Sequence, residues 1–298
     1  MNDGYRKTSN KNGGQWSGPC FFTNQGRDRF TIEPNNSEGP RWFCRKCSNS
    51  CQEGFDGGSY RYGSLNKEIP SMPKQTYKPG VITFDSAIAF AQNLSEEGML
   101  YLNDRGLDDY TAMYFHLGMN AAQTAITIPL TYKWKGVNTC PGIKYRYLPK
   151  FAPKDRHPYG SITGSKNKGI FNFDALKEPQ IFGIIANSLF DVMLLHQLGF
   201  VVIGPYAGEA SWEAEWSKYI KWEYIINLGD RDKADSKGRY PGEDYMMHRC
   251  ELLSTSMTSN VISSLAPEGY TDINAAYMDK FDVVNWINDT LDKGSRDV

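Results

Sequence analysis

The chain has 298 residues, of which 40% are hydrophobic and 13% aromatic, and its formal net charge is −1. This composition is enough to bury the cores of two ordinary domains, so it excludes a disordered chain. No run of about 18 apolar residues exists, which excludes a bilayer-spanning helix, and we expect a cytoplasmic protein without membrane partners.

The near-neutral net charge hides a separation of basic and acidic residues along the chain. Residues 131–177 carry 10 basic and 2 acidic residues, whereas residues 178–298 carry 10 basic and 19 acidic ones. A basic segment suits phosphate groups, and clustered carboxylates suit divalent cations. The alternative is two solvated faces of opposite sign.

Residues 1–62 are rich in Gly, Asn and Ser and predict a small β-rich module. Four of the six cysteines lie there: Cys20, Cys44, Cys47 and Cys51. The C-x2-C spacing of Cys44 and Cys47 lets two thiolates of one turn reach a tetrahedral Zn²⁺, and the clustering favours a metal over disulfides. Reduced cysteines that bind no metal are the alternative. Three prolines in residues 63–80 indicate a linker.

Helical periodicity begins at Asp85 and resumes at Asp108, which we expect to cap the second helix. Gly118 is the expected end of that helix. Strand patterns follow over residues 125–132 and 143–148.

Two basic residues, Lys144 and Arg146, alternate with apolar neighbours in the second of these strands. Because successive side chains of a strand point to opposite faces, both basic side chains can point to one face. Such a basic face suits phosphate groups. A half-exposed strand with a solvated basic face is the alternative.

The last part of the chain alternates strand and helix patterns. The predicted elements are a strand over 181–186, a helix over 189–198 closed by Gly199, a strand over 200–203, a helix over 211–220 and a strand over 224–228. This alternation predicts a parallel βαβαβ sheet covered by helices. Ligands of such sheets lie at the carboxyl ends of the strands, which here would bring together Asn187, Gly204 and Asp230.

Asp230 and Asp232 follow directly on the strand over 224–228. Two carboxylates at positions i and i+2 in a loop at a strand end can bind Mg²⁺ or Mn²⁺, which keep waters and substrate phosphates as their other ligands. Taken alone, an Asp-x-Asp pair is weak evidence, since exposed loops contain such pairs by chance.

Several motifs in order, from about Trp16 to Trp286, resemble DnaG-type DNA primases of bacteria and phages. Residues 228–234 look like the Asp-x-Asp motif of the Toprim domain, Asp191–Gly199 resembles the helix after the first Toprim strand, and residues 265–274 resemble the last Toprim motif. Residues 18–23 with 42–47 look like the zinc-binding module, and residues 101–107 and 142–148 look like parts of the primase polymerase domain.

The resemblance implies an α+β fold with a zinc-binding module at 1–62, a linker at 63–80, a basic part of a mixed α/β polymerase core at 81–177 and a Toprim-like subdomain at 178–298. Its implied site residues are Asp230, Asp232, Asp191, Lys144 and Arg146. Implied cofactors are Zn²⁺ and Mg²⁺ or Mn²⁺. Implied partners are single-stranded DNA, NTPs and a separate replicative helicase in a bacterial cell or a phage-infected host.

The sequence departs from the family pattern at two positions. The first Toprim strand ends in Asn187 where the family has a glutamate, and an asparagine can neither ionise nor take up a proton. Asp191, Asp235, Glu209 and Asp272 are candidate substitutes. Thr23 stands where the family has a His or Cys, so Cys51 is the candidate fourth zinc ligand.

The expected function is a primase that copies single-stranded DNA into short RNA primers by metal-dependent nucleotidyl transfer. The alternative is a primase-derived protein that has lost synthesis and binds single-stranded DNA or a replication partner. A Toprim nuclease or strand-passing enzyme would leave the zinc module and the basic strand unexplained.

Overall fold

The computed structural model describes residues 81–154, 157–177 and 179–296, and of the first 80 residues the backbone of five short strands. The chain forms two compact units, Met1–Gln75 and Thr76–Val298. The strands of the first unit form one antiparallel sheet in the order β1-β2-β3-β4-β5. Their bounds are Arg6–Ser9, Gln15–Gly18, Phe30–Glu33, Arg41–Cys44 and Tyr60–Arg61. Cys20, Cys47, Cys51 and the Cys44 side chain lie outside the described residues, so the zinc site stays a prediction.

The second unit begins with three short helices, α2 (Phe84–Ala91), α3 (Glu96–Asn103) and α4 (Asp109–Tyr114). The Asp108 side chain accepts a hydrogen bond from the backbone N–H of Thr111 at 2.7 Å, which confirms the expected cap. The apolar pattern from Asp85 onward is divided between two helices, because Ser95 caps a new one.

Gly118 does not close α4, which ends at Tyr114; instead it begins a strand. A Cβ atom at this position would lie 2.0 Å from the backbone oxygen of Phe90 at the end of α2. The glycine is therefore required by a close approach of two backbones, and the prediction of a helix end there was wrong.

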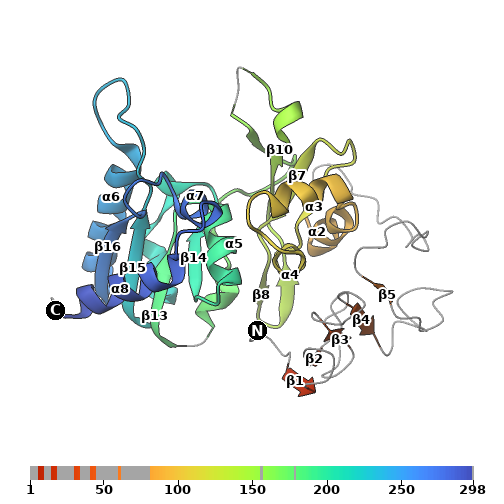
Figure 1. The fold of residues 1–298 in the computed structure, drawn as a ribbon, viewed down its shortest axis with the longest axis horizontal. Coiled ribbons are helices and arrows are strands. Elements are labelled where there is room, and N and C mark those ends of the chain that lie inside the picture. Colours follow the sequence, from red (N-terminus) through yellow and green to blue (C-terminus); the bar gives the residue numbers. More distant parts are fainter. Residues whose placement is uncertain are drawn as a thin grey trace. The chain divides into compact units, whose positions relative to one another are not determined.

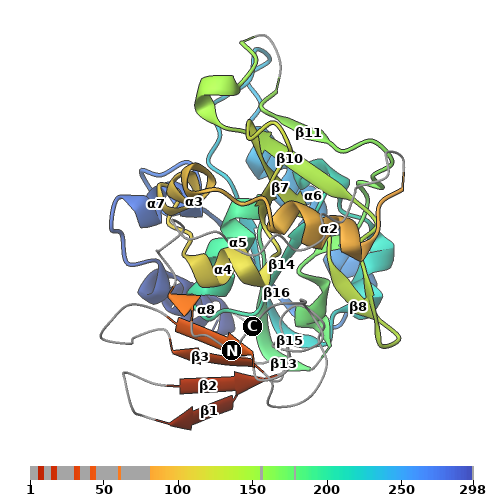
Figure 2. The same ribbon diagram turned by 90° about the vertical axis from the view of Figure 1, so that its right-hand side faces the viewer.

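A four-stranded antiparallel sheet of order β11-β10-β7-β6 follows, with α2 lying against β6 and β7 (Figure 2). Its strands are β6 (Gly118–Met119), β7 (Ala125–Pro129), β10 (Ile143–Tyr147) and β11 (Tyr159–Ser161). The expected strand over 125–132 ends at Pro129, and Tyr132 begins the separate hairpin of β8 (Tyr132–Trp134) and β9 (Val137–Thr139). A 3-10 turn, η2 (Pro149–Phe151), follows β10.

The C-terminal part is a five-stranded sheet of order β12-β14-β13-β15-β16, parallel except at its β12 edge (Figure 1). Its strands are β12 (Ile170–Phe171), β13 (Gln180–Ile185), β14 (Val202–Pro205), β15 (Trp222–Gly229) and β16 (Asn260–Leu265). Its α-helices are α5 (Leu189–Gln197), α6 (Pro241–Ser256), α7 (Ile273–Met278) and α8 (Val283–Arg296). The expected parallel sheet is present, and Gly199 ends α5 in a left-handed conformation with φ +94°.

Both faces of this sheet pack against a core, and residues that alternate along a strand belong to opposite faces. Ile184 and Ile226 contribute to a core with α5, α7 and α8, and this core also includes residues of β7. The neighbouring Ile185 and Ile225 point the other way, into a second core with Leu253 of α6. Because one core reaches both sheets, residues 81–296 pack as one body around it.

The helix expected over 211–220 is wrong. This stretch forms 3-10 turns, η4 (Glu209–Ser211) and η5 (Ala214–Tyr219), so the second crossover of the βαβαβ unit is not an α-helix. Trp212, Trp216 and Ile220 produced the helical pattern and are all buried in the second core. Apolar residues four apart can reach one core from 3-10 turns as well as from an α-helix, so the spacing alone did not distinguish them. A further 3-10 turn, η3 (Phe173–Leu176), precedes β13.

Within the described part of the chain, no helix is both long and apolar enough to cross a membrane.

Candidate functional site

Polar side chains of three neighbouring strands meet at the carboxyl-terminal edge of the parallel sheet. Asn187 lies just after β13, Asp230 directly follows β15, and Glu209 lies four residues beyond the end of β14. Because β14, β13 and β15 are adjacent and parallel, their carboxyl ends share one edge. The Asn187 Nδ2 atom donates a hydrogen bond to Glu209 Oε2 at 3.1 Å, so side chains 22 residues apart in sequence touch there.

Asp230 is the carboxyl of the site whose pKa the other acidic groups affect most. Burial, and after it the negative charges of Asp191, Glu209, Asp272 and Asp232, together raise its pKa to about 9. Four other acidic groups therefore act on one carboxyl. A cluster of this kind is more stable when a cation or protons neutralise it.

Asp232 is held at the amino end of α6. Its Oδ2 atom accepts a hydrogen bond from the backbone N–H of Gly242 at 3.0 Å. A Cβ atom on Gly242 would lie 2.4 Å from the backbone oxygen of Asp230, so the close approach of α6 to the Asp-x-Asp loop depends on this glycine. The structure thereby fixes the loop that follows β15.

Asp191, in the first turn of α5, is fully enclosed. Its carboxylate accepts hydrogen bonds from Ser188 Oγ at 2.7 Å and from the backbone N–H of Asn274 at 2.9 Å. Burial raises its pKa to about 7, and the nearby charge of Asp272 acts in the same direction. One carboxylate oxygen is thus bound to the residue that caps α5 and the other to the first turn of α7, which suits a positioning residue.

A buried arginine, Arg249 of α6, lies beneath the carboxylates with 1% of its surface exposed. It donates hydrogen bonds to Asn227 Oδ1 and to the backbone oxygen of Leu228. Burial lowers its pKa to about 10, whereas the charges of Asp230 and Glu209 counter that shift. Sequence reasoning missed Arg249, and the signal available was a lone basic residue in an acidic helix.

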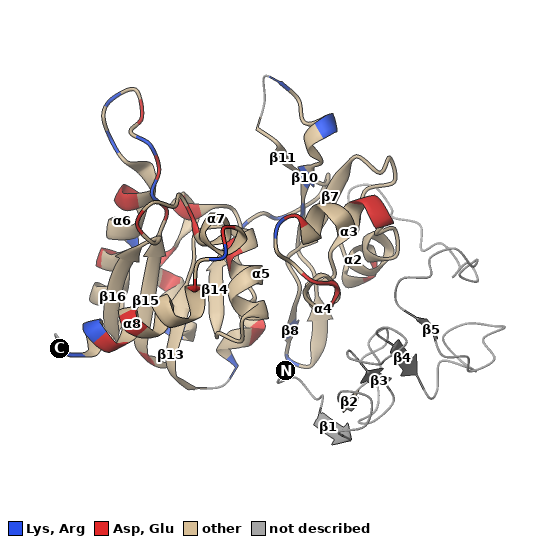
Figure 3. Cartoon of the chain, viewed as in Figure 1, with Lys and Arg blue, Asp and Glu red and all other residues tan. Residues whose placement is uncertain are grey.

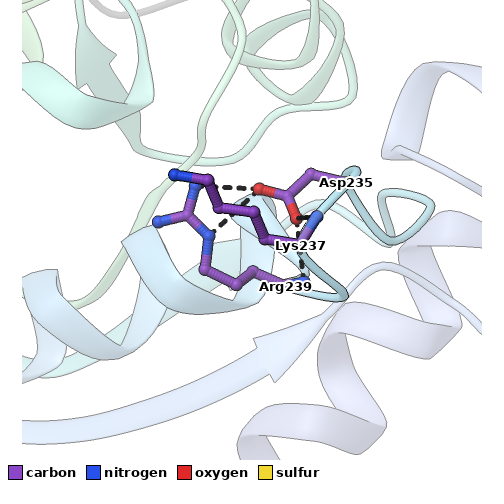
Figure 4. Close-up of polar contacts among 3 residues, drawn as sticks. All are labelled: Asp235, Lys237 and Arg239. Carbon is purple, nitrogen blue, oxygen red and sulfur yellow. Dashed lines mark hydrogen bonds and ion pairs between the residues drawn. The ribbon is translucent and has the colours of Figure 1, made fainter.

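Asp235, one of the expected substitutes for the missing glutamate, is engaged elsewhere (Figure 4). Its carboxylate accepts hydrogen bonds from the Arg239 guanidinium at 2.8 and 3.0 Å and from the backbone N–H of Lys237 at 2.7 Å. Hydrogen bonds from Arg239 lower the pKa of this exposed carboxyl. Asp235 therefore stabilises its own loop.

The two basic residues of β10 lie on one face of that strand, where both approach the Tyr159 ring. Lys144 Nζ donates to the backbone oxygen of Tyr206 at 3.0 Å, and burial lowers the pKa of this amine. Arg146 donates to the Tyr159 hydroxyl and stacks 5.3 Å from the ring centre of Phe190. Phe190 precedes Asp191 in α5, so the basic strand reaches the helix that carries one of the carboxylates.

Arg105, which lies within the motif at residues 101–107, also joins this arrangement. Its guanidinium carbon lies 5.7 Å from the ring centre of Tyr101 and 5.3 Å from that of Phe190, and its charge lowers the pKa of Asp191. Arg105 is the sole basic residue between positions 81 and 130, which was the available signal. Figure 3 shows the wider pattern, with acidic residues along α6 and near α7 and basic residues between β10 and β11.

The donor set at the sheet edge consists of carboxylate and amide oxygens, the ligands that hard divalent cations prefer. Among the described residues, no three His, Cys, Asp or Glu side chains are arranged to hold one ion together. Mg²⁺ commonly takes only one or two protein carboxylates and completes its shell with water and substrate phosphates. The Asp230 and Asp232 pair fits that chemistry. Asn187, whose buried Oδ1 atom has no hydrogen-bond partner, is bonded to Glu209 at the same sheet edge.

No family model and no curated protein matches the sequence. Three solved structures are similar in fold. The zinc-binding and RNA polymerase domains of the Aquifex aeolicus primase match with a TM-score of 0.55 and 16% identity, over 97% of this chain and 80% of that one. A DnaG catalytic core matches with a TM-score of 0.55 and 13% identity, over 70% of this chain and 78% of that one. A DnaG primase catalytic domain bound to single-stranded DNA matches with a TM-score of 0.53 and 14% identity, over 70% and 79%. The chain therefore has a primase-like fold.

Proposed function

We propose that the chain is a DNA primase that synthesises short RNA primers from NTPs on a single-stranded DNA template. The observation that carries the proposal is the Asp230 and Asp232 pair at the carboxyl end of β15, where burial and a group of neighbouring carboxylates together raise the pKa of Asp230 to about 9. Closely set, repelling carboxylates on a phosphate-handling fold suit metal-dependent phosphoryl transfer. The parallel sheet would be the Toprim subdomain.

Asp230 and Asp232 would hold Mg²⁺ or Mn²⁺, which would neutralise the triphosphate and the departing pyrophosphate. Asp230 must lose its proton when it binds a cation, because a carboxylate ligand is ionised. Asp191 would keep α5 and α7 in place through Ser188 and Asn274. The reaction joins a hydroxyl oxygen to the α-phosphorus of an NTP and breaks its bond to pyrophosphate.

The basic face of β10 would position phosphates. One of the three ammonium protons of Lys144 is used by Tyr206, which leaves two for phosphate oxygens. The Arg146 guanidinium uses one donor on Tyr159 and is held flat by the rings of Tyr159 and Phe190. A guanidinium oriented in this way loses little entropy on binding phosphate.

The N-terminal module (1–62) would hold Zn²⁺ through Cys20, Cys44, Cys47 and Cys51 and would bind template, with residues 63–80 as a linker to the core at 81–177 and 178–298. A separate replicative helicase would be the partner. The similarity to a DnaG primase catalytic domain bound to single-stranded DNA supports single-stranded DNA as the template of the core, and the template role of the N-terminal module rests on the sequence alone.

A second function is favoured by one specific observation. Asn187 at the end of β13 is neutral and 4% exposed, so the carboxylate that the Toprim pattern has there is missing. A protein that lost synthesis in this way would still bind single-stranded DNA or a replication partner.

Primer synthesis by the full chain on single-stranded DNA with NTPs and Mg²⁺ or Mn²⁺ separates the two functions. We expect labelled RNA product that falls about 10³-fold or more in Asp230→Ala/Asp232→Ala, since metal stabilisation of the transition state contributes several kcal/mol. Asp289→Ala/Asp292→Ala removes two exposed carboxylates of α8 and should leave synthesis unchanged. No product from a chain that still binds single-stranded DNA would establish the binding function instead.

A further inference from the structure

We propose that Glu209 supplies the carboxylate that Asn187 lacks, so that the acidic ligand of the site comes from the end of β14 instead of the end of β13. This inference rests on the proposed function for its catalytic meaning. The role of Glu209 concerns cation binding, which can be measured without primer synthesis.

The chain holds Glu209 at the sheet edge through a fixed turn. Gly208 has φ +116°, a conformation that side-chain-bearing residues rarely adopt, and it turns the chain after Tyr206. The Ser211 Oγ and backbone N–H atoms both donate to the Gly208 oxygen, at 2.6 and 3.0 Å. Glu209 therefore projects from a closed turn beside the carboxyl end of β13.

Positions 187 and 209 are chemically complementary. The Asn187 amide donates to Glu209 Oε2 at 3.1 Å. A glutamate at 187 would instead place a second negative charge against Glu209, next to an Asp230 whose pKa is already raised by its neighbours. An asparagine at 187 with a glutamate at 209 keeps one carboxylate at this point of the edge and removes the repulsion.

Two residues that interact with Glu209 each carry a buried polar atom without a hydrogen-bond partner, which fits a ligand at this edge. In the described part of the chain, Asn187 Oδ1 and Arg249 Nη1 are buried without a hydrogen bond, on residues 4% and 1% exposed. An orphaned buried polar atom is costly, so native sites seldom keep one without an ion or water. An amide oxygen can bind a cation, and a water bound to that cation would donate to the carboxylates and could accept from Arg249 Nη1.

The other acidic candidates are engaged. Asp191 accepts from Ser188 and Asn274, Asp272 caps α7 through the backbone N–H of Ala275 at 2.6 Å, and Asp235 is bound by Arg239. Among the described residues, Asn187 alone donates to Glu209, and only to Oε2. Glu209 thus keeps one carboxylate oxygen without a hydrogen bond. Burial and the charge of Asp232 raise the pKa of Glu209, whereas the charge of Arg249 opposes that shift.

The test is Mn²⁺ binding to the full chain, measured by calorimetry and by the paramagnetic resonance signal of free Mn²⁺. Glu209→Gln should weaken binding about tenfold or more, since even outer-shell partners of metal sites cost roughly 10–100-fold. The glutamine still accepts the Asn187 hydrogen bond, so folding should be retained, as circular dichroism in EDTA would verify. Glu215→Gln, an equal charge change at an exposed residue of η5, is the matched control and should bind as the wild type does.

A second variant guards against indirect effects. Asn187→Glu/Glu209→Gln moves the carboxylate back to β13 and should restore Mn²⁺ affinity to within about threefold of the wild type, a smaller change than the loss of a ligand. Wild-type affinity in Glu209→Gln, or equal weakening in Glu215→Gln, would overturn the assignment.

Primer synthesis, measured in parallel, separates this inference from the proposed function. If the wild type synthesises primers and Glu209→Gln does not change Mn²⁺ binding, the proposed primase function stands and the role of Glu209 is overturned. If Mn²⁺ binding depends on Glu209 but the chain synthesises no primers, Glu209 is supported as a cation ligand and the proposed primase function is overturned.

Discussion

The basic face of the antiparallel sheet and the acidic edge of the parallel sheet handle charge in opposite ways. Lys144, Arg146 and Arg105 each have a partner within the protein, either a backbone oxygen, a hydroxyl or an aromatic ring. Asp230 instead faces other acidic groups, which raise its pKa. The comparison teaches that the side proposed to bind phosphate already has its partners within the protein, whereas the side proposed to bind a cation is strained until a cation or a proton neutralises it.

Tyr206→Phe breaks the organised side and should have the largest effect on stability. The buried Tyr206 hydroxyl donates to the backbone oxygen of Ile128 at 2.5 Å and accepts from the backbone N–H of Lys144 at 2.6 Å. Phenylalanine leaves both backbone groups without this partner, so the free energy of unfolding should fall by about 2–4 kcal/mol in urea titrations. Tyr270→Phe, which removes an exposed hydroxyl that donates to Asp279, is the control and should cost about 0.5 kcal/mol or less. Equal losses in the two variants would contradict the role of Tyr206.

Asp230→Asn relieves the strained side and should act in the other direction. In EDTA at pH 8 the substitution removes a carboxyl that its neighbours disfavour, so the free energy of unfolding should rise by about 1–2 kcal/mol while Mn²⁺ binding is lost. Asp235→Asn is the opposite control, because hydrogen bonds from Arg239 favour that carboxylate and its loss should not stabilise the protein. Stabilisation of both variants, or of neither, would remove the contrast between the two sides.

The sequence predicted the sheet edge better than it predicted which acid serves there. Strand and helix alternation placed Asn187 and Asp230 at neighbouring carboxyl ends, because the topology of a parallel sheet follows from periodicity and connection length. Glu209 lies just before the stretch over 211–220, which periodicity predicted to be an α-helix. Its position depends instead on a glycine turn and on the 3-10 geometry of η4 and η5. The engaged state of Asp235 depends on a bond to Arg239 within an irregular loop, which no pattern of apolar residues encodes.

The same limit applies to the core and to the basic strand. The alternation of Lys144 and Arg146 was sufficient to place both on one face of β10, since strand period alone decides that. Their partners Tyr206 and Phe190 lie more than 40 residues away in sequence, and only the shared core of the two sheets brings them together. The prediction that Gly118 ends a helix was wrong for a related reason, because the close approach of Gly118 to Phe90 is a tertiary contact.

The smallest effect is expected from Asp191→Asn, and it should depend on pH. The folded-state pKa of Asp191 is raised to about 7 from an ordinary 3.8, chiefly by burial and then by Asp272, with Ser188, Asn274 and Arg105 opposing. The folded protein therefore holds this proton more tightly than the unfolded chain. The resulting stability is fully present below about pH 4 and is lost as the pH rises through 7.

The asparagine cannot ionise, so its stability relative to the wild type should rise as the pH increases from about 4.5 to about 8. The altered hydrogen bonds to Ser188 and Asn274 lower the stability of the variant by an amount that does not depend on pH, so the net gain at about pH 8 should be only about 1 kcal/mol. Thermal unfolding in EDTA at several pH values measures this difference, and Asp289→Asn on the exposed face of α8 is the matched control. A pH-independent difference between Asp191→Asn and the wild type would mean that the enclosed carboxyl stays ionised in the folded protein. In that case Arg105 and the two hydrogen bonds outweigh burial, and the strain at the sheet edge is confined to Asp230 and Glu209.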